Sequence, residues 1–330
     1  MRSEMARISL IILACLAGCG GRIARGGPSS GTDGGTVSTD SASSALPARV
    51  MLFGGATDRL PQFGYAADTW TWNEAGWNEA TSAPPARIVT AMARLADRIV
   101  MFGGKDSQGH YLDDTWEWDG AWHQQTVAGP SARGQHAMVT FGNVIVLEGG
   151  YDDHGALSDT WEWDGTAWTN MNAKGPDLSN GAMTAIQDHI AALAGPPPNG
   201  TTNKTWLFDG AMWSAVTTNG PTGRTGFAMA TVGTSAILFG GYGVNDLTLG
   251  LLLDDTWQLD GTTWTELPVT GPPARSAYAM TTVDDSVLLF GGLVANGIAD
   301  DTWQWQGGAW TPLGGSVPSA RYAFAMATGP

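Results

Sequence analysis

Four features are scarce in this 330-residue sequence, and each scarcity excludes a class of protein. There are only two cysteines, Cys15 and Cys19, so the chain after residue 19 folds without a disulfide or a thiolate metal site. Lysine and arginine number 16 against 31 acidic residues, and the net charge of −15 argues against nucleic acid and anionic membrane surfaces as partners. No stretch has a helical period long enough to predict a helix. The five histidines follow no metal-site spacing, so we expect neither a metal nor a cofactor.

The first 18 residues are predicted to be a signal peptide. Arg2 and Arg7 flank an apolar run, residues 8–17, that is too short to span a bilayer. The run leads into Leu-Ala-Gly-Cys at residues 16–19, which resembles the lipobox of bacterial lipoproteins. The resemblance implies that Cys19 becomes the lipidated N-terminus. The alternative is an ordinary secretory signal in which Cys19 is incidental.

Residues 19–47 are predicted to be a flexible tether. They are rich in Gly, Ser, Thr and Asp and nearly lack apolar side chains, so they cannot offset their ordering entropy by burial. Gly20 follows the cysteine where some bacteria place an inner-membrane retention aspartate. The sequence therefore predicts a lipid-anchored bacterial envelope protein, at the outer membrane or cell surface, with residues 48–330 as its folded domain.

One stretch, residues 114–122, is the unit from which that domain is built. Trp116 and Trp118 are two residues apart and share one face of a strand. Asp119-Gly120 suits a two-residue hairpin turn, and Trp122 opens the return strand. Closely similar stretches follow at residues 159–168, 255–264 and 301–310.

Two landmarks show that the repeat occurs six times, about every 45 to 51 residues, which is the period of propeller blades. Each repeat reads as four short strands separated by turn residues. Paired small residues end the second strand of each repeat at 54–55, 103–104, 149–150, 194–195, 240–241 and 291–292. First strands carry Met92, Met138, Met183, Met229, Met280 and Met326.

The two ends of the domain predict how the ring closes. The first repeat begins at Val50 with its second strand, whereas the chain finishes with an unused first strand, residues 321–327. The spare strand matches the missing one. We therefore expect a six-bladed ring whose last strand completes blade one and leaves no open sheet edge.

The repeat resembles the kelch repeat over residues 50–327. The shared features are Gly-Gly after the second strand, an aromatic residue on the third, tryptophan on the fourth and arginine before the first. The resemblance implies an all-β, six-bladed kelch-type β-propeller with four-stranded blades. All 16 tryptophans fall on third or fourth strands, where we expect them to pack between blades rather than stack on carbohydrate.

Five arginines open first strands and five acids open third strands, at the same end of each blade. Such pairs could brace a blade, and the fourth repeat lacks both partners at once. The resemblance implies an alternative, an anion-binding ring at the channel mouth. The arginines are Arg87, Arg133, Arg224, Arg275 and Arg321, and the acids are Asp68, Asp114, Asp159, Asp255 and Asp301.

The longest loops are predicted to lie at residues 56–67 and 242–254, on the face where loops join strands two to three and four to one. Five leucines in the second loop form a candidate partner-docking cluster, or else fold back onto the ring. They are Leu247, Leu249, Leu251, Leu252 and Leu253.

The sequence favours a monomeric, non-enzymatic module that binds a protein or glycan in the cell envelope. The alternatives are a sugar-processing envelope enzyme of the kelch type, for which no convincing set of acid and base residues is found, and a structural spacer without a ligand. No catalytic residue is predicted.

Overall fold

The computed structural model describes residues 49–57, 64–80, 83–179, 181–195, 203–244, 250–315 and 317–329. The predicted signal peptide and tether, with Cys19, lie outside these residues, as do Leu247 and Leu249. The described residues form strands and turns without any helix. Within them there is accordingly no helix of the length and hydropathy needed to cross a membrane.

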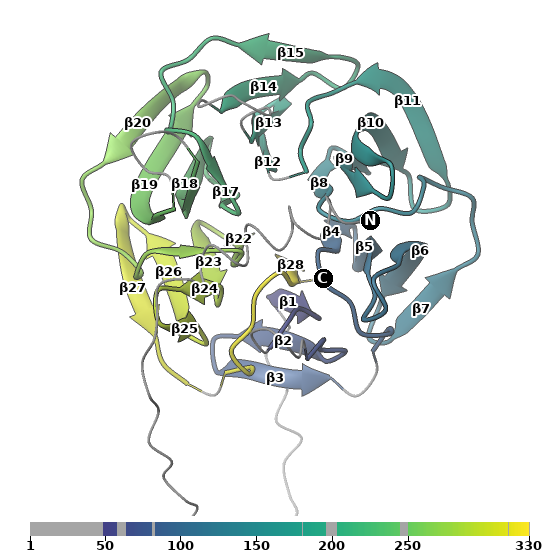
Figure 1. Ribbon diagram of the computed structural model, residues 1–330, viewed down its shortest axis with the longest axis horizontal. Coiled ribbons are helices and arrows are strands. Elements are labelled where there is room, and N and C mark those ends of the chain that lie inside the picture. The colour runs from purple at the N-terminus through teal and green to yellow at the C-terminus, as the bar shows by residue number, and fades with distance from the viewer. Residues whose placement is uncertain are drawn as a thin grey trace, which may run out of the picture. The chain divides into compact units, whose positions relative to one another are not determined.

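The described strands form seven antiparallel sheets around a central channel, five of four strands, one of five and one of three (Figure 1). We group them by repeat into six blades, called blades 1 to 6, and assign the small three-stranded sheet to the edge of the last two. The inner strands of blades 1 to 6 are β28 (Ala325–Thr328), β4 (Ala91–Leu95), β8 (Ala137–Phe141), β12 (Ala182–Ile186), β17 (Ala228–Val232) and β22 (Ala279–Val283). The second strands are β1 (Val50–Phe53), β5 (Arg98–Lys105), β9 (Val144–Asp152), β13 (His189–Ala194), β18 (Ser235–Gly243) and β23 (Ser286–Phe290).

The third and outer strands complete each blade. The third strands are β2 (Thr69–Asn73), β6 (Tyr111–Trp118), β10 (Gly155–Trp163), β14 (Lys204–Phe208), β19 (Leu252–Asp260) and β26 (Thr302–Gln306). The outer strands are β3 (Gly76–Ala80), β7 (Trp122–Gln125), β11 (Trp168–Lys174), β15 (Trp213–Val216), β20 (Thr263–Leu267) and β27 (Ala309–Leu313). Four two-residue strands extend blades 5 and 6: β16 (Arg224–Thr225), β21 (Arg275–Ser276), β24 (Leu293–Val294) and β25 (Gly297–Ile298).

The C-terminal strand closes the ring, as predicted. β28 pairs antiparallel with β1, and the register places Val50 opposite Thr328 and Phe53 opposite Ala325. The inner strands then contact one another in a complete cycle, from β28 through β4, β8, β12, β17 and β22 back to β28. The all-β kelch-type fold expected from the repeats is therefore confirmed.

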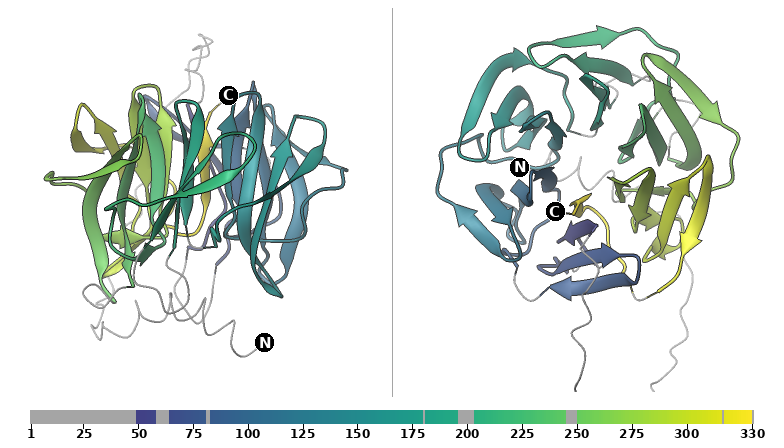
Figure 2. Two further views of the ribbon diagram at one scale, coloured as in Figure 1. Left: turned by 90° about the horizontal axis from the view of Figure 1, so that it is seen from above. Right: turned by 180° about the vertical axis from the view of Figure 1, so that it is seen from behind.

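The blades run between two different faces, which Figure 2 shows from the side and from behind. The turn face carries the short hairpin connections, such as residues 96–97 and residues 119–121, the latter one residue longer than the two-residue turn predicted at Asp119-Gly120. The loop face carries the longer connections, such as residues 106–110 and 126–136. Because of this division, the equivalent loops of all the repeats lie on the same face, although they are far apart in the sequence.

The first strands are shorter than the sequence predicts. In blade 2 we expected a strand from residue 88, but β4 begins at Ala91 because Val89 has a left-handed backbone with φ of 51°. The N–H of Val89 donates to the carbonyl of Ala323 in blade 1, and the N–H of Gln135 in blade 3 donates to the carbonyl of Val89, both at 2.8 Å. Since Gln135 and Ala323 are also left-handed, the strained residue links neighbouring blades at the loop-face mouth of the channel.

Tryptophan and threonine join neighbouring blades on their outer side. The indole N–H of Trp168 in blade 3 donates to the Thr115 hydroxyl in blade 2 across 2.9 Å, and both residues are buried. The threonine of the Asp-Thr-Trp motif is thus the acceptor for the next blade. The same bond occurs at every junction: Trp122–Thr69, Trp168–Thr115, Trp213–Thr160, Trp264–Thr205, Trp310–Thr256 and Trp77–Thr302.

The hydrophobic core lies between blades, as predicted for the tryptophans. Trp118 and Trp122 of blade 2 pack with Met51 and Phe53 of blade 1 in one buried cluster. The rings of Phe53 and Trp122 meet nearly edge to face, with centroids 5.7 Å apart. Equivalent clusters fill the other junctions.

Paired glycines permit a close backbone approach between blades. Gly103 has φ of 59°, and a Cβ there would lie 2.6 Å from the carbonyl oxygen of Arg133. The N–H of Gly104 donates to that same carbonyl across 2.9 Å. Any side chain at residue 103 would therefore separate blade 2 from blade 3.

Candidate functional site

Each arginine that opens a first strand is buried and holds three strands of its own blade. In blade 3 the Arg133 guanidinium donates to both carboxylate oxygens of Asp159, at 2.7 and 2.9 Å, and to the carbonyl of Gly149 at 3.0 Å. Its Nε donates to the carbonyl of Ser131, also at 3.0 Å. Arg133 is 0% exposed. This is a bidentate, charge-assisted brace of the kind predicted from the sequence.

The same brace occurs in five blades and shifts the pKa of several of its acids. In blade 3, burial pushes the pKa of Asp159 upward, but hydrogen bonds from Arg133 and Trp161 outweigh it and hold the pKa below its usual range. The pairs are Arg87–Asp114, Arg133–Asp159, Arg224–Asp255, Arg275–Asp301 and, across the closure, Arg321–Asp68.

Blade 4 replaces both members of the pair. Leu178 stands near the arginine position and is completely buried, while Lys204 takes the acid position and is exposed. A Cβ on Gly149 would lie 3.1 Å from the backbone nitrogen of Leu178, so this segment packs closely against blade 3. An apolar side chain here substitutes for the ion pair.

The arginine ring offers little to an anionic ligand. The five guanidinium side chains are 0 or 1% exposed. In Arg133 all the donor nitrogens bond to the protein itself, since Nη2 also reaches the Ser131 hydroxyl at 3.0 Å. The geometry therefore favours bracing over binding for these residues.

Tyrosine, by contrast, gathers on the loop face. All six tyrosines of the sequence lie at this end of their blades. Tyr242, Tyr278 and Tyr322 are buried. Tyr65, Tyr111 and Tyr151, from blades 1, 2 and 3, are only half-buried, and we call these three the tyrosine arc.

Two members of the tyrosine arc lie close to one another. A Cβ on Gly134 would touch the Tyr111 ring at 3.3 Å, and the backbone of Gly134 pairs in both directions with Tyr151. Burial and then the charge of Asp106 raise the pKa of Tyr65. Tyr111 and Tyr151 therefore form one patch over blades 2 and 3, and Tyr65 lies on the same face of the neighbouring blade 1.

Charged groups border the tyrosine arc. The Lys105 ammonium lies 4.3 Å from the centroid of the Tyr111 ring, a cation–π contact. Asp152 and Asp153 directly follow Tyr151, and Asp153 is exposed. Aromatic rings are enriched in protein interfaces, and the rims of such interfaces are polar.

The leucine cluster is only partly described. Leu251 is exposed to 55%, whereas Leu252 and Leu253 are half-buried because they pair with Tyr242 and Gly241 of β18. The loop is shorter than expected from the sequence, since β18 extends to Gly243 and β19 starts at Leu252. It too lies on the loop face.

Comparison with known families decides the affiliation. The family model described as the KLHDC2/KLHL20/DRC7 Kelch-repeats domain matches residues 30–195, half of the chain. The chain belongs to the kelch-repeat family. No curated protein matches the sequence. Kelch repeats generally mediate protein–protein interactions.

Two buried titratable groups of this kelch domain are enclosed by the protein. Burial lowers the pKa of His136 to about 3 and raises that of Glu148 to about 8. His136 packs edge to face on Phe102 between blades 2 and 3, and Glu148 is 0% exposed between blades 3 and 4. Neither carboxyl nor imidazole reaches a position where it could exchange a proton with a substrate.

The histidines and acids of the described kelch blades form no metal centre. Within the part of the chain that the structure describes, no three His, Cys, Asp or Glu side chains gather so as to hold a metal ion. His154, which follows the acidic pair in the loop after β9, is almost completely exposed and lies 3.7 Å from Asp152.

Sequence reasoning missed the tyrosine arc, although a signal for it existed. Tyr65 precedes the third strand of its repeat, Tyr111 opens one, and Tyr151 directly follows a Gly-Gly pair. Each of these positions maps to the loop face once the strand order is known. The threonine of the Asp-Thr-Trp motif was likewise visible at six equivalent positions, but its role as an acceptor between blades depends on the distance between strands.

Proposed function

We propose that this kelch domain is a protein-binding module whose loop face docks a partner in the bacterial cell envelope. The observation that carries the proposal is the tyrosine arc. Three half-buried aromatic rings from adjacent blades offer a large contact area at a low cost in side-chain entropy.

The partner we propose is a protein with a basic docking surface. The loop face presents Asp106, Asp152 and Asp153 around the tyrosine arc, with Lys105 already held over the Tyr111 ring. The whole chain carries a net charge of −15. Complementary charge on the partner would speed association and fix the docking orientation.

The envelope location rests on the sequence of the leader. We propose that Cys19 is lipidated and that residues 19–47 hold the domain at the outer membrane or cell surface. With Cys19→Ser we expect loss of lipid labelling and release of the protein from the membrane fraction. Retention of the label on the Cys19→Ser chain would contradict the anchor.

Photo-crosslinking in intact cells tests the binding face. We would replace Tyr111 or Tyr151, one at a time, by p-benzoylphenylalanine in the full-length protein. The matched control is the same replacement at Met212, which is 61% exposed on the turn face of blade 4. We expect one discrete crosslinked protein from both tyrosine positions and none from Met212.

The opposite pattern would overturn the proposal. A discrete product from Met212 alone would move the partner to the turn face. Unmodified protein at all three positions, with full crosslinker incorporation, would favour a structural spacer. A crosslinked product that contains glycan but no second protein would show that the partner is a glycan.

A further inference from the structure

Among the described residues that line the central channel, one side chain is charged. A cavity of about 260 Å³ is lined by three levels of residues from the six inner strands, and Arg94 is the only ionisable residue among them. The level nearest the turn face consists of Arg94 in blade 2 and, in the other blades, Thr140, Ala185, Thr231, Thr282 and Thr328.

The threonines at this level use their hydroxyl protons to join the blades. Thr282 donates to the carbonyl of Thr231 at 2.8 Å, and Thr328 donates to the carbonyl of Thr282 at 2.7 Å. Thr231 and Thr140 likewise donate to the carbonyls of Ala185 and Arg94. A hydroxyl has one proton, so these groups retain only acceptor capacity toward a molecule in the channel.

The next level adds no free donor. Thr184 lies 2.7 Å from the Thr231 hydroxyl oxygen, and Thr281 lies 3.2 Å from that of Thr328. Because Thr231 and Thr328 already donate to carbonyls, Thr184 and Thr281 are the donors in these two pairs. The hydroxyl protons of all six threonines that line the cavity are therefore committed.

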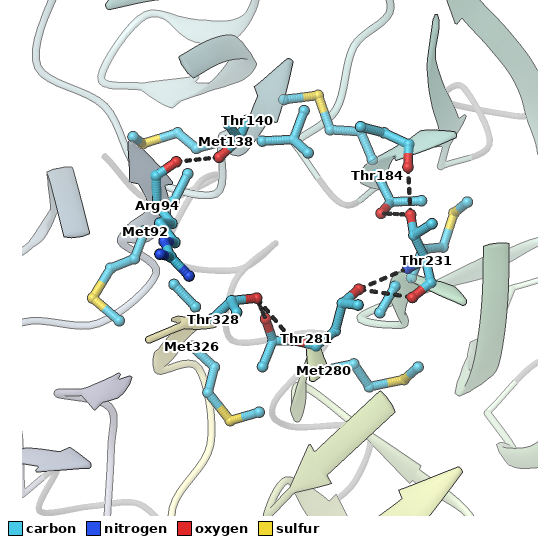
Figure 3. A pocket seen from close by; sticks show the side chains of 18 residues that line it. Met92, Arg94, Met138, Thr140, Thr184, Thr231, Met280, Thr281, Met326 and Thr328 are labelled. Atoms are coloured by element: carbon cyan, nitrogen blue, oxygen red, sulfur yellow. Dashed lines mark hydrogen bonds between the residues drawn. The ribbon is translucent and has the colours of Figure 1, made fainter. Parts of the chain in front are cut away.

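Arg94 is oriented toward the channel and keeps its outer donors. Its Nε donates to the carbonyl of Ala96 across 2.7 Å, on a turn where Ala96 has a left-handed φ of 53°. Among the described residues this is the one hydrogen bond of its guanidinium, which leaves the fork of terminal nitrogens available. Figure 3 shows this side chain extending into the opening between Thr140 and Thr328.

The donors of Arg94 and the acceptors of the threonines define the chemistry of a ligand that would fit the channel mouth. A planar guanidinium fork matches the two oxygens of a carboxylate. Threonine oxygens that only accept match hydroxyl groups that donate. We propose that the turn-face mouth of the channel binds a small hydroxy-carboxylate, with its carboxylate on Arg94 and its hydroxyl groups on Thr140 and Thr328.

The charge around the mouth limits the ligand to a compact monoanion. Asp97, Asp188 and Asp284 lie on the hairpin turns that follow inner strands at this end. Their negative field opposes an anion with several charges, whereas one carboxylate is neutralised by Arg94 alone. The site is on the face opposite the tyrosine arc, so its test is independent of the proposed protein partner.

Glycerate and two matched analogues provide the test, measured by ligand-observed NMR titration of the full-length protein. Propionate has the carboxylate without the hydroxyls, and glycerol has hydroxyls without the carboxylate. We expect saturable binding of glycerate, at least fivefold weaker binding of propionate and no saturation with glycerol. Equal affinities for glycerate and propionate would overturn the role of the threonines.

Variants of Arg94 test the carboxylate contact. Arg94 is exposed and its carbonyl still accepts from Thr140 after substitution, so Arg94→Gln should retain the thermal melt of the parent. We expect Arg94→Gln to weaken glycerate binding at least tenfold and Arg94→Lys to weaken it less, since lysine keeps the charge but loses the fork. The control Lys174→Gln removes an equal charge from an exposed position on the outer strand of blade 3, away from the channel, and should bind like the parent. Unchanged affinity in Arg94→Gln, or no saturable binding to the parent, would overturn the site.

Discussion

Glu148 occupies the position that phenylalanine fills in blades 1, 2, 5 and 6. Its Oε2 lies 2.6 Å from the Thr160 hydroxyl, which also bonds the carbonyl of Ala173 at 3.1 Å and the indole N–H of Trp213 at 3.0 Å. The Thr160 hydroxyl has one proton to share between Glu148 Oε2 and the carbonyl of Ala173, and Oε1 of Glu148 has no hydrogen-bond partner among the described residues. Burial therefore outweighs the bond from Thr160 and raises the pKa of the carboxyl to about 8.

This group should make stability fall as the pH rises. The unfolded carboxyl is ionised above its ordinary pKa of 4.5, whereas the folded one keeps its proton until about pH 8. The folded state thus holds one extra proton in this window, and raising the pH favours unfolding. Unfolded His136 is half protonated at its ordinary pKa of 6.5 and opposes this slope there, so between pH 7 and 8 we expect Glu148 to cost roughly 1 kcal/mol per pH unit.

Urea denaturation across that range, on the parent and on Glu148→Gln, measures the effect. The free energy of unfolding of the parent should decrease from pH 7 to 8, and that of the variant should stay nearly level. Parallel slopes for the two proteins would show that Glu148 does not titrate in this window.

The threonine of the Asp-Thr-Trp motif provides a second test at residue scale. Thr115→Val keeps the shape of the side chain but leaves the buried indole N–H of Trp168 without its acceptor. We expect a loss of about 1–3 kcal/mol in the free energy of unfolding. Thr169→Val, an exposed change on the outer strand of blade 3, should alter it by less than about 0.5 kcal/mol. Equal losses in the free energy of unfolding for the two variants would show that the motif threonine does not stabilise the contact between blades.

At the scale of elements, one arginine unites three strands. Arg133 precedes β8 and bonds Gly149 of β9 and Asp159 of β10. Arg133→Ala removes a fully buried side chain and the partner of the half-buried Asp159, and we expect a loss of about 3 kcal/mol. Arg49→Ala breaks only exposed ion pairs and should cost less than about 1 kcal/mol. Chemical denaturation compares them, and a loss below 1 kcal/mol for Arg133→Ala would refute the brace.

The closing strand is the element on which the ring depends. Deleting residues 317–330 would remove β28 and the Arg321–Asp68 pair, and would expose the inner edge of β1. An unpaired strand edge promotes association between chains. We expect the truncated protein to lose its single cooperative thermal transition and to associate, as measured by calorimetry and light scattering. A cooperative, monodisperse truncated domain would contradict closure by β28.

At the scale of the whole molecule, repetition made most of the fold predictable. Six copies of one pattern located the strands and the tryptophan packing, and the mismatch between Val50 and residues 321–327 predicted the closure. The Arg–Asp braces followed from strand direction alone. The residues that the repeats share are therefore those that stabilise the ring.

The candidate sites lie where repeats differ, and their contacts could not be derived from a pattern. Arg94 stands where most repeats have threonine, and Glu148 stands where most have phenylalanine. The environment of each depends on neighbours from another blade, such as Thr328 beside Arg94. Val89 has a left-handed backbone that shortens its strand. The sequence around it is typical of a strand, so the shortening could not be predicted.

The central claim is that the tyrosine arc binds a protein, and affinity measures it most directly. We would purify the partner captured at Tyr111 and determine its Kd by calorimetry for the parent, for Tyr111→Ser with Tyr151→Ser, and for Met212→Ser. We predict at least a tenfold increase in Kd for the double variant, because aromatic anchors dominate such interfaces, and no change for Met212→Ser. An unchanged Kd in a folded double variant would contradict the claim and remove the loop face over blades 1 to 3 as the binding surface.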